Sequence, residues 1–88
     1  MIGFRYLPLY GDTMSREDRK NFQARARHNE RRAKTCRRMS QLNLNYADQA
    51  RTPGIAAMYR TIAANLVTCA ETFESTARHL RSLVEASR

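Results

Sequence analysis

The strongest constraint on the fold is a 4,3 spacing of mostly apolar residues in the C-terminal part of the chain. The spacing repeats every 3.5 residues over four heptads, which is typical of helices packed as a coiled coil. Ala63, Ala70 and Ala77 lie beside this column and would allow another helix to approach closely. We therefore predict a helix over about residues 53–86 with the column at its interface. The column consists of Ile55, Tyr59, Ile62, Leu66, Cys69, Phe73, Thr76, Leu80 and Leu83.

A second long helix is predicted over about residues 15–51, because this stretch contains no Gly or Pro. Ser15 can cap its start, and Thr52-Pro53 both ends it and begins the next helix. The chain is thus predicted to be all-α: an N-terminal arm at residues 1–14, then a long antiparallel helical hairpin domain at 15–88. The first helix has its own 4,3 column: Phe22, Ala26, Asn29, Ala33, Cys36, Ser40, Asn43, Ala47 and Ala50.

A lone hairpin buries only one side of each helix and would be marginally stable. Leu66, Phe73 and Leu80 offer more apolar surface than one helix lined with small residues can cover. We therefore expect a homodimeric four-helix bundle. Residues whose numbers add to about 105 should face each other across the turn. Cys36 and Cys69 are accordingly expected to be core neighbours, as buried thiols or as a disulfide if the helices are close enough.

Composition and motifs narrow the function classes. No window reaches the roughly 18–20 apolar residues of a membrane span, and the apolar start lacks the features of a signal peptide, so we expect a cytoplasmic protein. There is no Gly-rich phosphate loop, HExxH motif or nucleophile elbow. The cysteines and histidines lack metal-ligand spacing. We expect neither enzymatic activity nor a metal or cofactor.

Charge is concentrated in the first predicted helix. Residues 16–38 hold ten basic and three acidic residues, which gives +7 of the chain's formal +8. Such asymmetry indicates a polyanionic partner. At 100° per residue, Arg25, Arg32 and Arg37 fall on the shoulders of a basic ridge that faces away from the core. The ridge itself consists of Arg16, Lys20, Arg27, Arg31, Lys34 and Arg38. The acids Glu71, Glu74 and Glu85 are expected on the outer face of the second helix, near Arg60 and Arg78.

Residues 23–34 read Gln-Ala-Arg-Ala-Arg-His-Asn-Glu-Arg-Arg-Ala-Lys. This segment resembles the arginine-rich RNA-binding motif of lambdoid phage N antitermination proteins. The resemblance covers about twelve of the 88 residues. It implies a helix on an RNA hairpin, with an early alanine against the RNA and arginines on phosphates. Here Ala26 and Ala33 also belong to the column of the first helix. The residues to which the resemblance assigns RNA contacts are Ala24, Arg25, Arg27, Arg31 and Arg32.

Two functions follow as hypotheses. The first is a small regulatory protein that binds RNA or DNA through the basic ridge, with phosphates paired to guanidinium groups. The second is an inhibitor of the kind encoded by phages and mobile elements, such as anti-CRISPR-like proteins, which binds and occludes a host protein surface. In that case the ridge would dock on an acidic protein patch, and Phe4, Tyr6 and Tyr10 of the arm would supply apolar anchors.

Overall fold

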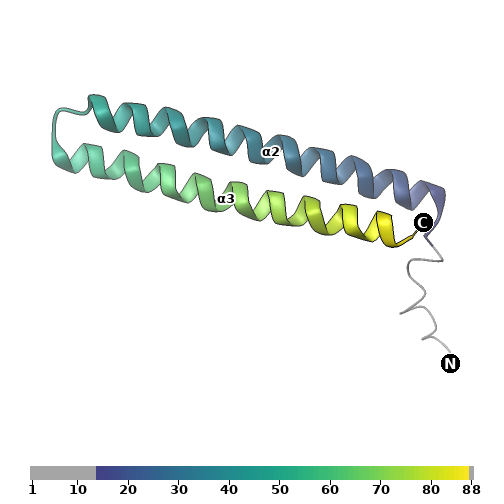
Figure 1. The fold of residues 1–88 in the computed structure, drawn as a ribbon. Helices are drawn as coiled ribbons and strands as arrows, with labels where there is room; N and C mark the ends of the chain where they lie inside the picture. Colours follow the sequence, from purple (N-terminus) through teal and green to yellow (C-terminus); the bar gives the residue numbers. More distant parts are fainter. Residues whose placement is uncertain (1–13, 88) are drawn as a thin grey trace.

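The computed structural model describes residues 14–87, which form two helices of 34 residues each. Helix α2 (Arg16–Gln49) and helix α3 (Pro53–Ala86) run antiparallel and lie side by side along their whole length (Figure 1). Each helix is about 50 Å long at 1.5 Å per residue. The predicted all-helical hairpin is therefore confirmed. The predicted arm, apart from Met14, lies outside the described residues.

Local sequence sets where α2 begins and where the two helices meet the turn. The Ser15 hydroxyl accepts a hydrogen bond from the amide of Asp18 at 3.0 Å, so it caps α2. The Thr52 hydroxyl accepts one from the amide of Ile55 at 3.3 Å and caps α3. Pro53 follows in the first turn of α3, where its missing N–H costs no hydrogen bond. The turn between the helices needs only the residues between Gln49 and Pro53.

The two helices meet along a column of small side chains, which we call the alanine seam. Seven of the nine buried hydrophobic residues among those described are alanines, so the helix backbones approach closely. In the middle of the seam the Ser40 hydroxyl donates a hydrogen bond to the Ala63 carbonyl at 2.9 Å. The seam consists of Ala26, Ala33, Ser40 and Ala47 from α2 and Ala56, Ala63, Ala70, Ala77 and Val84 from α3.

The predicted interface column is correct for α2 and wrong in part for α3. In α3 the seam runs one position C-terminal to the predicted column, and Ile55, Ile62, Cys69 and Thr76 are exposed. Leu80 is buried as predicted. The reason is steric: a column with one alanine per heptad lies next to the predicted column and permits the shorter distance between the helices. The larger side chains of the predicted column therefore flank the contact.

The predicted register is confirmed by contacts across the hairpin. The Tyr46 and Tyr59 rings lie 5.4 Å apart, and the guanidinium of Arg32 lies 5.2 Å above the centre of the Phe73 ring. The residue numbers in both pairs add to 105, as expected. The prediction that both cysteines are buried is wrong, because Cys36 is half-buried and Cys69 is exposed, each as a free thiol.

Candidate nucleic-acid interface

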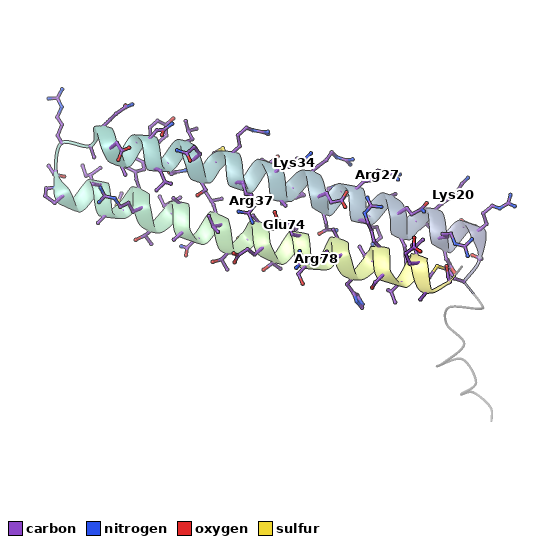
Figure 2. The ribbon with its side chains drawn as sticks, viewed as in Figure 1. Lys20, Arg27, Lys34, Arg37, Glu74 and Arg78 are labelled. Carbon is purple, nitrogen blue, oxygen red and sulfur yellow. The ribbon has the colours of Figure 1, made fainter. Side chains whose placement is uncertain are left out.

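The six residues of the predicted basic ridge are all exposed on α2. Lys20, Arg27 and Lys34 extend from the side of α2 that is turned away from α3 (Figure 2). None of the six forms an ion pair with another described residue. The ridge spans about 33 Å of helix at 1.5 Å per residue. It is thus a row of exposed positive side chains within residues 14–87.

The alanine seam holds this row in a fixed direction. Ala26 and Ala33 are buried against α3, and each is followed directly by a ridge residue, Arg27 or Lys34. Because successive helical positions are rotated by 100°, burying the alanine side of α2 turns the ridge outward over several turns. The packing of Ala26 and Ala33 against α3 therefore sets the direction in which Arg27 and Lys34 point.

Glu30, the one acid between Arg27 and Lys34, is paired with the other helix. Glu30 accepts two hydrogen bonds from the Arg81 guanidinium, at 2.7 and 2.8 Å. These hydrogen bonds lower the pKa of the Glu30 carboxyl below its ordinary value, and the nearby charges of Arg81, Lys34 and Arg27 add to the effect. The carboxylate is thus ionised at neutral pH, yet its hydrogen-bonding capacity is directed to α3 and not to the ridge.

A second ion pair of opposite polarity lies one heptad further along α2. Arg37 donates to the Glu74 carboxylate at 2.7 and 2.8 Å, and Figure 2 shows the pair bridging the two helices. The hydrogen bonds raise the pKa of Arg37 and lower the pKa of Glu74. Arg37, predicted as an auxiliary binding residue, is therefore engaged within the hairpin. Glu74, expected on the outer face of its helix for solubility or for pairing with Arg78 or Arg60, is instead paired with Arg37.

The remaining predicted binding residues differ in their surroundings. Arg25 and Arg32 are exposed, but the guanidinium of Arg32 lies over the Phe73 ring and shields that apolar side chain. Arg19, which lies outside the predicted set, is half-buried and donates to the hydroxyl and carbonyl of Ser87 at 3.0 to 3.1 Å. The structure thus separates six free cations from neighbours that help to join the helices.

Sequence reasoning missed the role of Arg81, which pairs with the acid that interrupts the basic tract. A sequence signal for this pair exists. Glu30 lies one heptad before Arg37 and Arg81 lies one heptad after Glu74, so the two ion pairs repeat along the hairpin with their charges exchanged. Finding it requires the register of the hairpin, because neither pair is close in sequence. A charge count within one helix cannot detect it.

Residues 14–87 contain no group of three or more His, Cys, Asp or Glu residues that could hold a metal ion. Neither α2 nor α3 is long and apolar enough to cross a membrane. Comparisons of the chain with protein-family models, with curated proteins and with solved structures find no match.

Proposed function

We propose that this protein binds RNA or DNA through the basic ridge of α2. The observation that carries the proposal is the row of six exposed cations without ion-pair partners among the described residues, next to an acid that is already paired with Arg81. An unneutralised row of this kind attracts a polyanion, because every phosphate that it neutralises releases a condensed counterion. Guanidinium groups also form bidentate hydrogen bonds with phosphate oxygens.

The dimensions of the ridge suit a nucleic acid. Its length of about 33 Å is close to one turn of B-form DNA, which is about 34–36 Å. An RNA hairpin is an equal candidate, because Ala24, Arg25 and Arg27 of the segment that resembles the phage RNA-binding motif are all exposed. Rigid positioning favours binding, since the side chains stand on a helix packed along its whole length and less order is lost on association.

Binding is measured by fluorescence anisotropy with a duplex DNA, a single-stranded RNA and an RNA hairpin, each between about 50 and 200 mM salt. We expect the affinity for the preferred ligand to fall roughly a thousandfold over this range if all six cations contact phosphates. Replacing Arg31 and Arg38 by Gln should reduce the slope of log K against log salt by about 1.8 for a duplex, because two contacts are lost.

The matched control replaces Arg51 and Arg60 by Gln, which removes the same charge from exposed positions outside the ridge. This control should leave the slope nearly unchanged. Equal effects of the two double variants would show that net charge alone drives binding and would contradict a defined ridge. Affinity weaker than millimolar for all three ligands at about 50 mM salt would overturn the proposal.

The alternative hypothesis, an inhibitor that docks on an acidic host protein, predicts a different result in a pull-down from lysate treated with nuclease. A stoichiometric protein partner that survives nuclease and is lost in the Arg31 and Arg38 variant would favour it. Its proposed apolar anchors, Phe4, Tyr6 and Tyr10, lie outside the described residues.

A further inference from the structure

Exposed large hydrophobic side chains are confined to one half of the hairpin. All seven of those among the described residues lie between Met39 and Ile62. We call residues 39–66 the turn half, and residues 16–38 with 67–87 the terminal half. The turn half holds two basic residues and one acidic residue, against twelve and six in the terminal half. The turn half is therefore apolar and almost uncharged.

Six of the seven side chains share one side of the hairpin. Contacts identify this side: the Tyr46 and Tyr59 rings meet there, and Arg32, two heptads before Tyr46, covers Phe73. Leu44 is on the opposite side, because it follows Arg37 by one heptad and Arg37 pairs with Glu74 along that edge. We call the six residues the apolar face: Met39, Leu42, Tyr46, Ile55, Met58 and Ile62.

The apolar face begins where the arginines stop. Arg25, Arg32, Met39 and Tyr46 follow one another at seven-residue intervals on this side of α2. In the terminal half these positions carry guanidinium groups, one of which lies over an aromatic ring of α3. In the turn half the same positions carry apolar side chains that are 43% exposed. The turn half therefore lacks the guanidinium groups that occupy these positions in the terminal half.

We propose that the apolar face packs against the same face of a second copy of this chain. The resulting contact is two-fold symmetric and joins the turn halves of two hairpins into a four-helix bundle. The inference rests on this face alone and does not depend on nucleic-acid binding by the ridge.

The hairpin's own core indicates why the occupant is a second copy. The described residues include no large side chain that is fully buried, and the seam is made mainly of alanine. A small domain with such a core gains stability from additional apolar burial. A second copy can supply this burial wherever the chain itself is present.

Charge determines how the two copies are arranged. The terminal halves carry twelve basic and six acidic residues each, so a parallel arrangement would place two net charges of +6 beside each other. The turn halves carry a net charge of +1 each and can approach with little repulsion. The copies therefore overlap through their turn halves in an antiparallel sense, and the two basic ridges point to opposite ends of the dimer.

The size of the apolar face suits a reversible dimer. Its exposed area is on the order of 500 Å², which is near the upper end for the largest apolar patch of a monomer. Two such faces bury about 1,000 Å², at the lower limit of specific interfaces. We therefore expect a dissociation constant in the micromolar range, on the order of 1 to 100 μM.

Sedimentation equilibrium of the full chain without nucleic acid tests the proposal, with Leu42→Gln as the variant and Leu44→Gln as its control. Both leucines are 39% exposed on α2, but only Leu42 belongs to the apolar face. We expect a monomer–dimer equilibrium that Leu42→Gln weakens at least tenfold, and that Leu44→Gln leaves within about twofold. A monomer at all concentrations up to about 200 μM, or equal weakening by both variants, would overturn the proposal.

Salt tests the orientation in the same measurement. In the antiparallel dimer the basic ridges are far apart, so the dissociation constant should change little between about 0.1 and 0.5 M salt. A dimer that becomes much tighter with salt would place the ridges side by side and would refute the antiparallel arrangement. Circular dichroism of each variant checks that the helices are intact. Since no nucleic acid is present, failure here leaves the proposed function of the ridge unaffected.

Discussion

The terminal half and the turn half are built on the same alanine seam but present opposite surfaces. The seam continues without change from Ala33 in the terminal half to Ala63 in the turn half, each only 2% exposed. On the outside of α2, arginine and lysine end at Arg38, and apolar side chains begin at Met39. One heptad repeat thus fixes the backbone, while the residues around it give each half its own surface. A uniform fold therefore presents two unlike surfaces.

The largest effect on stability is expected from substitutions in the alanine seam, which test whether the two halves depend on it equally. Ala33→Leu and Ala63→Leu each insert a large side chain where two backbones approach closely. We expect each to destabilise the hairpin by about 1–3 kcal/mol, because the helices must separate. Urea denaturation followed by circular dichroism measures this free energy of unfolding.

Ala64→Leu is the control for the seam variants, since Ala64 is exposed on the same helix next to Ala63. It should change the free energy of unfolding by less than about 0.5 kcal/mol. A large loss for Ala33→Leu and none for Ala63→Leu would break the comparison, because the seam would then support only the terminal half.

A smaller effect is expected from pH, which should change the stability that the ion pairs of the terminal half contribute. The pKa values of Glu30 and Glu74 are lowered in the folded state, so their ion pairs contribute stability above the ordinary carboxyl pKa of 4.5. This stability is lost as the pH falls below that value through the lower folded pKa. Both pairs lie in the terminal half and are exposed, so the melting temperature should fall by only a few degrees.

Thermal melts between about pH 6 and pH 3 measure this effect in the wild type and in the variant with Glu30→Gln and Glu74→Gln. The double variant should lose less stability on acidification than the wild type. Glu71→Gln, an exposed change on the same helix, should behave as the wild type does. An identical acid response in the double variant would mean that the cross-helix pairs do not stabilise the terminal half.

The smallest effect is expected at the one hydroxyl in the seam of α2. Ser40→Ala removes the hydrogen bond to the Ala63 carbonyl but improves helix propensity by a few tenths of a kcal/mol and restores the alanine pattern. The two changes nearly cancel, so the free energy of unfolding should change by less than about 0.5 kcal/mol. A loss above about 1.5 kcal/mol in the same denaturation assay would show that Ser40 fixes the register of the turn half.

Much of the fold could be predicted from local signals. The caps at Ser15 and Thr52 and the long stretch without Gly or Pro specified two helices and the turn between them. The candidate ridge was also predictable, because 100° per residue places its six members on one side of a helix whose seam contains Ala26 and Ala33. These inferences need only the properties of one helix.

The contact side of α3 could not be chosen from spacing alone. Ile62 and Ala63 belong to adjacent columns that both recur with the heptad, and hydrophobicity favoured the wrong one. The ion pairs of Arg37 and Glu30 could not be predicted either, because their partners are 37 and 51 residues away in sequence. Only the register of the hairpin brings those side chains together.

The sequence by itself determined that this chain forms a basic helix and a second helix joined by a capped turn, because helix propensity, capping and charge are local properties. The tertiary structure decided which side chains the two helices hide and which remain available. It placed alanines at the contact, since only small residues allow the helices to come so close. It also paired Glu30 with Arg81, which directs that carboxylate to α3 and away from the ridge of α2.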